Sequence, residues 1–213
     1  MANILVYTLD GKIYINLTNR CTNDCIFCLR NDKADVVGQR LWLDSEDFGA
    51  DDVIQQYNEI LRSAQNDGVS YANEVVFCGY GEPMLKFEIL KEVSKYIKEH
   101  YPNTKIRVNT NGHANYVYKR NVVPELKGLV DEFSVSLNGE NSAEYDELSQ
   151  PKFDGAYDEV KKFIKACSDE GISVVASVVE GYKGRHIDLE KCEEISKSLG
   201  AKFRAREWIV NGY

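Results

Sequence analysis

A strand-like run, a polar loop and an amphipathic helix recur along this chain of 213 residues. Strands that alternate with helices are typical of a parallel sheet with helices on its outside. A closed eight-stranded barrel typically needs about 250 residues. The sequence therefore predicts an α/β fold, a partial (β/α)6 TIM-like barrel that is open on one side. Its six strands are expected at Lys12–Thr18, Glu74–Cys78, Lys105–Asn109, Glu132–Leu137, Ser173–Val179 and Lys202–Arg206.

The remaining elements follow from local signals. Asp10-Gly11 favours a two-residue hairpin turn between Ile4–Leu9 and the first barrel strand, which adds an N-terminal β-hairpin strand. Asp188 suits a helix N-cap and Gly200 a helix end, a shorter helical piece follows Ser142, and Pro124 interrupts or starts a helix. The longer helices are expected at Ala50–Asn66, Phe87–His100, Ala156–Glu170 and Leu189–Leu199. No composition break divides the chain, so we expect a single domain over residues 1–213.

Several expected strands are apolar on one face only. Phe133 and Val135 alternate with Ser134 and Ser136. The same alternation presents Arg107 with Asn109, and Arg204 with Arg206. The apolar faces must meet the helices, which leaves the polar faces to line a lumen that holds ligand and water. An antiparallel sheet with one wet face is the alternative, and the intervening helices disfavour it.

Three cysteines, Cys21, Cys25 and Cys28, lie in one loop directly after the first barrel strand. Their spacing lets three thiols meet one metal centre. A structural zinc site is normally closed by four protein ligands, and an ordinary cubane iron–sulfur cluster by four cysteines. Three cysteines leave one iron of such a cluster open to bind something else. The alternative is a zinc site whose fourth ligand comes from elsewhere, such as Cys78 or His113.

Glycines and polar residues follow the next strands. Gly79, Tyr80, Gly81, Glu82 and a proline come after the second strand and form a tight turn that exposes its backbone. The third strand ends in Asn109-Thr110-Asn111-Gly112 and the fourth in Ser136-Leu137-Asn138-Gly139. Asn111 and Gly112 are equally consistent with simple turn chemistry. Loops at these strand ends carry the chemistry of barrel enzymes.

Composition narrows the class of protein. A net charge of −8 argues against a chain that grips long duplex nucleic acid. No run of about twenty apolar residues is present, so we expect no membrane span. The first residues lack the pattern of a secretory signal, and six cysteines in such a chain suggest reduced thiols in the cytoplasm.

Together these motifs resemble the radical S-adenosylmethionine (radical SAM) superfamily. The resemblance implies that Cys21, Cys25 and Cys28 bind a 4Fe-4S cluster, whose open iron is chelated by the methionine part of S-adenosylmethionine. Phe27 is then expected beside the adenine. The Gly-Tyr-Gly-Glu turn resembles the family's Gly-Gly-Glu motif, although Tyr80 departs from it. The further residues expected to bind the cofactor are Gly79, Gly81, Glu82, Asn109, Ser136, Asn138 and Arg206.

Arg204 and Arg206 are both expected to point into the lumen. An inward guanidinium suits a carboxylate or a phosphate, through two parallel hydrogen bonds. A structural salt bridge to Glu180 or Glu82 is the competing interpretation.

The closest resemblance is narrower. The chain resembles the TatD-nuclease-associated radical SAM proteins, small bacterial members of uncertain reaction that are often encoded beside a TatD-type nuclease. The stretches that carry it are Asn16–Cys21, Phe77–Pro83, Asn109–Asn115, Asn121–Leu126 and Ser136–Asn138. The resemblance implies an electron donor such as a flavodoxin or ferredoxin, a functional link to the nuclease, and a 5′-deoxyadenosyl radical that abstracts hydrogen from an unidentified substrate. A peptide and a nucleic acid are both open as substrates, and the sequence identifies no catalytic residue.

Other functions stay open at this point. Within the same superfamily the chain is also consistent with a small-heterocycle synthase of the deazaguanine-forming type, or with an activase that installs a glycyl radical on a partner. From a different class, it is consistent with a non-catalytic iron or zinc module that binds a nuclease or RNA.

Overall fold

The computed structural model describes residues 3–32, 35–36, 38–68, 71 and 73–208. One curved sheet organises them, in the order β1-β2-β5-β6-β7-β8-β9. β1 pairs antiparallel with β2, and each later strand joins its neighbour in parallel. β1 and β9 are the two edges of this sheet, so the barrel is open between them in the described part of the chain. The strands are β1 (Val6–Leu9), β2 (Lys12–Ile15), β5 (Glu74–Phe77), β6 (Lys105–Thr110), β7 (Glu132–Ser136), β8 (Ser173–Glu180) and β9 (Lys202–Glu207).

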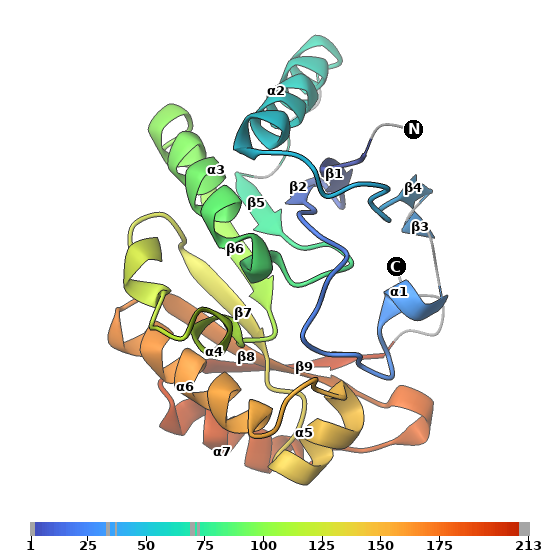
Figure 1. The fold of residues 1–213 in the computed structure, drawn as a ribbon, viewed down its shortest axis with the longest axis vertical. Coiled ribbons are helices and arrows are strands. Elements are labelled where there is room, and N and C mark those ends of the chain that lie inside the picture. Colours follow the sequence, from blue (N-terminus) through green and yellow to red (C-terminus); the bar gives the residue numbers. More distant parts are fainter. Residues whose placement is uncertain (1–2, 33–34, 37, 69–70, 72, 209–213) are drawn as a thin grey trace.

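Helices cover the outside of the curve, whereas the loop that leads to α1 lies on the inside (Figure 1). This arrangement confirms the partial barrel with an N-terminal hairpin strand. The helices are α1 (Leu29–Asp32), α2 (Ala50–Asn66), α3 (Phe87–His100), α4 (Ala114–Tyr118), α5 (Ser142–Ser149), α6 (Ala156–Asp169) and α7 (Leu189–Ser198), with short 3-10 turns at Pro83–Lys86, Val123–Leu126 and Tyr182–Gly184. None of these helices is long and apolar enough to cross a membrane.

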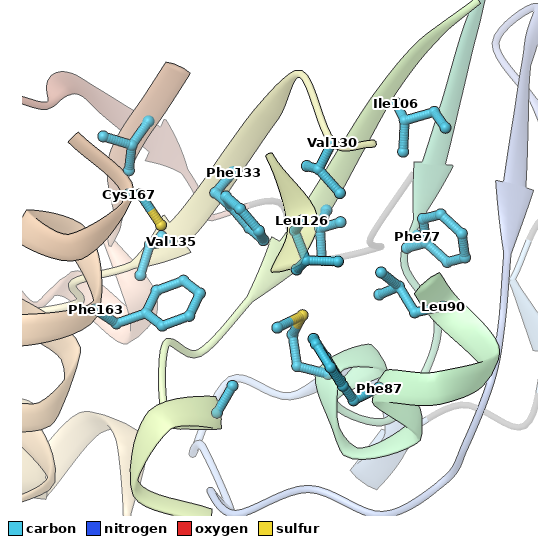
Figure 2. Close-up of a cluster of buried hydrophobic side chains, with 14 of the residues drawn as sticks. Phe77, Phe87, Leu90, Ile106, Leu126, Val130, Phe133, Val135, Phe163 and Cys167 are labelled. Carbon is cyan, nitrogen blue, oxygen red and sulfur yellow. The ribbon is translucent and has the colours of Figure 1, made fainter. Parts of the chain in front are cut away.

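The alternation within each strand explains the layers. Phe133 and Val135 are fully buried under the helices, where the Phe133 ring meets Phe163 of α6 edge-on at 5.3 Å (Figure 2). Ser134 and Ser136, between them in sequence, line a cavity on the other face. Burying one such aromatic side chain contributes about 1.5–3 kcal/mol. The outer face of the sheet therefore forms the core, and the inner face is left for polar groups.

Local signals place the helix ends. The Asp188 carboxylate accepts a hydrogen bond from the Lys191 backbone N–H at 2.9 Å, which caps α7. Gly200 ends the same helix with φ +79°, a left-handed conformation that favours glycine. Pro124 lies at the start of the short turn Val123–Leu126. Both expectations for α7, and the helix start near Pro124, are confirmed.

Several features differ from the sequence expectation, among them the short helix α4, which was not predicted. The first barrel strand ends at Ile15 rather than Thr18, because the Asn16 and Thr18 side chains bond to Leu41 O and to Glu46. The hairpin of β3 (Asp35–Val36) and β4 (Gln39–Arg40), like α1, is an element that the sequence did not predict. Two-residue strands carry no readable periodicity.

Candidate functional site

The cysteine loop follows β2 and closes over the end of the barrel. Cys21, Cys25 and Cys28 are each partly buried, and all three line one cavity of about 400 Å³. The loop is fastened by its backbone to the end of α5. Its Asp24 N–H donates to Ser149 O at 3.1 Å, and its Ile26 N–H to Leu148 O at 3.0 Å. These contacts hold the thiols over the cavity.

Side chains from β6 and α5 support the same loop. The Asn111 amide donates to Thr22 Oγ1 at 2.7 Å and lies 3.5 Å from Cys21 Sγ. The ring of buried His113 lies between Thr22 Oγ1 and Tyr145 Oη, each 2.9 Å from one of its nitrogens. Both ring nitrogens of His113 are therefore engaged, and burial lowers its pKa to about 4. This leaves His113 as a support for the loop rather than a fourth metal ligand.

The thiols lie in an environment that opposes their ionisation. Burial, together with the nearby Cys21 and Cys28, raises the pKa of Cys25 to about 12. Burial and the Glu82 charge also raise the pKa of Cys21. Three thiolates in one cavity need a cation to neutralise them, because a bound metal lowers the pKa of the thiols that coordinate it.

The donor set suits a cluster better than a single ion. Within the described residues, no three His, Cys, Asp or Glu side chains converge as a site for one metal ion. The three thiols nevertheless face one cavity. Sulfur donors of this kind are the ligands of iron–sulfur clusters. Cys21, Cys25 and Cys28 thus fit a cluster that spans the space between them.

The glycine turn after β5 lies directly against the cysteine loop. A Cβ on Gly81 would lie 2.3 Å from Thr18 O and 2.4 Å from Arg20 O, so only glycine fits there. The next backbone N–H, of Glu82, donates to Arg20 O at 2.8 Å. This close approach joins the ends of β2 and β5.

Glu82 holds the turn to the end of β6. Its Oε1 accepts from Thr110 Oγ1 at 2.7 Å and from the Met84 N–H at 3.0 Å, and its Oε2 from the Asn111 N–H at 2.7 Å. Burial raises the pKa of this carboxyl to about 7, against the lowering effect of these three donors. Both oxygens are used within the protein, so Glu82 contributes to the cavity mainly through its backbone.

The turn lines the cavity, and its aromatic side chain packs against other residues of the cavity wall. Gly79, Tyr80, Gly81 and Glu82 all line the cavity. The Tyr80 ring packs with Tyr7 and Leu41 in a small separate apolar cluster. The departure from glycine at Tyr80 is therefore accommodated by this cluster.

The strands line the cavity with polar groups, as the alternation predicts. Asn109 of β6, Ser136 of β7 and Arg206 of β9 all face it. The Arg204 guanidinium donates to Ser134 Oγ at 2.9 Å. Neither β9 arginine forms the salt bridge that was the competing interpretation. Glu180 accepts instead from His186 at 2.7 Å, and Glu82 is occupied as described.

Two expected cofactor residues lie away from the cavity lining. Asn138 is buried with φ +55°, and its amide donates to Ser149 Oγ at 3.1 Å. Phe27 packs edge-on against Tyr182, with ring centroids 5.9 Å apart. All the other expected residues, including the three cysteines, line the one cavity.

Sequence reasoning missed several residues of the site. Tyr7 and Tyr14 line the cavity from the hairpin, and their rings stack at 5.3 Å. Asn111, which the sequence treated as equally consistent with a turn, contacts Cys21. Tyr145 reaches the loop from 122 positions away, by accepting from Asn23 Nδ2. The only sequence signal for Asn111 was its place just after a strand.

A larger cavity, of about 650 Å³, lies at the opposite end of the strands. It is lined by Ile13, Val75 and Thr104, at or just before the starts of β2, β5 and β6, together with Tyr57 and Tyr101. No cysteine lines it. Chemistry in barrel folds lies at the carboxyl ends of the strands, so we take the smaller cavity as the functional one.

Comparisons with known proteins agree with this geometry. The family model described as "Radical SAM superfamily" matches residues 15–205. No curated protein sequence matches the chain. Among solved structures, SuiB of Streptococcus suis bound to the precursor peptide SuiA is 20% identical, with a TM-score of 0.65, over 96% of this chain and 40% of SuiB.

Two further solved structures share the fold. The radical S-adenosylmethionine methyltransferase TsrM from Kitasatospora setae, with cobalamin and a [4Fe-4S] cluster bound, is 11% identical, with a TM-score of 0.53, over 92% of this chain and 36% of TsrM. HydG, a maturase of the [FeFe]-hydrogenase, is 16% identical, with a TM-score of 0.54, over 92% of this chain and 42% of HydG. The chain thus spans well under half the length of each of these proteins.

Proposed function

The chain belongs to the radical SAM superfamily, and from that premise we propose that Cys21, Cys25 and Cys28 hold its 4Fe-4S cluster. It is an enzyme whose reaction is unspecified, in a family that uses such a cluster together with S-adenosylmethionine. The observation that carries the proposal is that three thiols from one fastened loop face a single cavity. The neighbouring Gly81 turn closes against that loop.

The chain's own residues have the following proposed roles. The backbone of Gly79, Tyr80 and Gly81 hydrogen-bonds the amino group of the cofactor, and Asn109 and Ser136 bind its polar groups from the strands. Bound together and given one electron by the donor, the cluster and S-adenosylmethionine would supply methionine and a 5′-deoxyadenosyl radical that takes a hydrogen atom from the substrate. The barrel orients the substrate and excludes water from the reacting groups.

Phe27 and Asn138 enter this proposal with changed roles. The Phe27 ring packs against Tyr182 beside the cysteine loop and shields one side of that loop, outside the lining of the cavity. Asn138 fastens the end of β7 to α5 through Ser149. The backbone of α5 also binds the cysteine loop, so Asn138 helps to position that loop indirectly, through α5.

The finer identity is also a proposal. We place the chain among the TatD-nuclease-associated radical SAM proteins, on the five sequence stretches that resemble them, as a single core domain over residues 1–213 that works in the cytoplasm. Radical SAM enzymes need an electron donor, and we propose a flavodoxin or a ferredoxin. SuiB was solved with a precursor peptide, which keeps a peptide among the candidate substrates beside nucleic acid. A small-heterocycle synthase and a glycyl-radical activase are the alternatives for the reaction.

The test is cluster assembly and cofactor cleavage under anaerobic conditions. The reconstituted protein should be brown, contain about four irons per chain, and form 5′-deoxyadenosine when it is reduced in the presence of S-adenosylmethionine. A triple Cys21→Ala, Cys25→Ala, Cys28→Ala variant should lose both properties. Cys192→Ala removes a thiol from α7, outside the cavity lining, and serves as the control.

Two outcomes would contradict this proposal. A triple variant that still makes 5′-deoxyadenosine would refute the assignment of the three cysteines. Stoichiometric zinc with no visible absorbance in the wild-type protein would refute the cluster itself.

A further inference from the structure

The cavity is positively lined in a protein that is acidic as a whole. The chain carries a net charge of −8. Among the described residues, the cavity lining nevertheless contains four arginines and one carboxylate, Glu82, beside the three cysteines of the loop. A cleft with an excess of one sign of charge concentrates ligands of the opposite sign. The question is which of these arginines is available to a ligand.

Two of the four arginines are held by the protein itself. Arg30 donates to Asp24 Oδ1 at 2.9 Å and to the Asn23 carbonyl, so it fastens the cysteine loop. Arg107 lies 3.1 Å from Glu74 Oε1 in an ion pair. Glu82 is saturated by its three donors, as described above. Arg204 and Arg206 line the cavity from β9 and carry its other two arginine charges.

Arg204 and Arg206 lie two positions apart on β9, on the face that lines the cavity. Arg204 reaches across to Ser134 Oγ on β7. The Nε of Arg206 is enclosed and has no hydrogen-bond partner among the described residues. Arg206 is only partly buried, and an enclosed N–H without a partner is unfavourable, so an anion beside this Nε would stabilise it.

The surroundings of Arg206 place that anion within the lumen. Burial raises the pKa of Cys78, at the end of β5, while hydrogen bonding from Asn109 and the charges of Arg206 and Arg107 act in the opposite direction. Arg206, Cys78 and Asn109 line the same cavity, although β7 and β8 separate β9 from β6 in the sheet. The Asn109 Oδ1 is likewise enclosed without a partner. The Arg206 N–H is thus the unsatisfied donor that an anion could use, whereas the Asn109 Oδ1 is an acceptor that needs a donor from the ligand.

We propose that Arg204 and Arg206 bind an anionic group of the substrate, a carboxylate or a phosphate. This inference rests on the proposed function, in which the cofactor's own carboxylate is bound at the cluster over the loop that follows β2. β9 is at the other end of the strand order. The planar guanidinium forms two parallel hydrogen bonds with either anion. Arg206 is thereby reassigned from the cofactor, where the sequence resemblance placed it, to the substrate.

The geometry also orients the substrate. An anionic end held at β9 leaves the rest of the molecule between β9 and the cysteine loop. In a productive substrate, the carbon–hydrogen bond that reacts must then lie at a fixed distance from the anionic group. Substrates without that group should bind weakly.

The experiment measures anion and cofactor binding separately on the anaerobically reconstituted protein. Inorganic phosphate and acetate serve as probes of the two anion types, titrated calorimetrically at low salt beside S-adenosylmethionine. We expect Arg206→Gln to weaken the better-bound anion by about 10- to 100-fold and to leave S-adenosylmethionine binding unchanged. Arg185→Gln is the matched control, because Arg185 pairs with Glu147 on the surface and does not line the cavity.

A second variant guards against a folding defect. Arg204 is exposed, so Arg204→Gln should fold normally and weaken the same anion. Circular dichroism and 5′-deoxyadenosine formation without substrate report whether each variant is intact. Equal anion affinity in Arg206→Gln, Arg204→Gln and Arg185→Gln overturns the inference. A parallel loss of S-adenosylmethionine affinity in Arg206→Gln also overturns it, since that result returns Arg206 to the cofactor.

The outcomes separate this inference from the proposed function. A wild-type protein that assembles no cluster and forms no 5′-deoxyadenosine contradicts the proposed function, whatever the anion titrations give. A cluster-loaded wild type whose anion binding does not depend on β9 contradicts this inference alone.

Discussion

Replacing Gly81 by alanine should loosen the joint between the glycine turn and the cysteine loop. The added Cβ would lie 2.3 Å from Thr18 O and 2.4 Å from Arg20 O, where ordinary contacts begin at 3.4 Å. The two backbone segments must therefore separate by about 1 Å, because neither oxygen is on a side chain that can rotate away. The hydrogen bond from the Glu82 N–H to Arg20 O, 2.8 Å long, cannot survive that movement.

The expected cost adds two contributions. Overpacking a close-packed site costs about 1–3 kcal/mol, and the lost hydrogen bond about 1 kcal/mol. Gly81→Ala should thus lower the free energy of unfolding by about 2–4 kcal/mol, which lowers the Tm by about 5–15 °C in a chain of this size. Because Arg20 precedes Cys21, iron content after reconstitution should fall as well.

Urea unfolding of the iron-free protein and iron analysis of the reconstituted protein measure the two effects. Gly49→Ala is the control, since a Cβ there meets nothing closer than Asp52 Oδ2 at 4.0 Å and φ is −111°. Gly49→Ala should lower the free energy of unfolding by less than about 1 kcal/mol. If Gly81→Ala were as stable as Gly49→Ala and bound as much iron, the close approach of the two loops would not support the site as argued.

Three further predictions concern single side chains. Burial raises the pKa of the Glu82 carboxyl from its ordinary value of 4.5 to about 7 in the folded state. Between these two pH values the folded protein keeps a proton that the unfolded chain has lost, so the stability that Glu82 contributes at low pH is lost as the pH rises. Urea titrations from about pH 5 to about pH 8 should show wild type losing stability relative to Glu82→Gln; a pH-independent difference would contradict this. Asn111→Ala removes a donor 3.5 Å from Cys21 Sγ, so the reduction potential of the cluster, followed by EPR, should become more negative; an unchanged potential would deny that contact. Asp188→Ala removes the α7 cap and should cost about 1 kcal/mol in urea unfolding, whereas Asp169→Ala, whose exposed carboxylate pairs with Lys165, should cost less.

Much of the fold follows from periodicity. The alternation of Phe133 and Val135 with Ser134 and Ser136 predicts both the buried face and the polar lumen, because side chains of a strand point to opposite faces. The boundaries of α2 and α3 match the expected ranges for the same reason, since long amphipathic helices carry a strong signal.

What sequence reasoning could not supply depends on contacts between distant segments. Asn138 is a polar residue just after a strand end, where a cofactor ligand is expected. Its left-handed backbone conformation, however, directs its side chain toward Ser149. His113 was a candidate fourth ligand of a zinc site, but Thr22 and Tyr145 engage both nitrogens of its ring. Neither partner is a neighbour in sequence, so no local pattern could reveal them.

The backbone bonds between the cysteine loop and α5 bear on how the enzyme matures. Asp24 and Ile26 donate to the last residues of α5, and Lys152 donates back to Thr22 O at 2.9 Å. Ordering a flexible loop costs about 1–2 kcal/mol for each backbone residue, whereas each of these three bonds contributes about 1 kcal/mol, so they offset part of that cost. The loop is thereby tied to α5 by contacts that need no iron, and the rest of its order would come from the cluster when it binds.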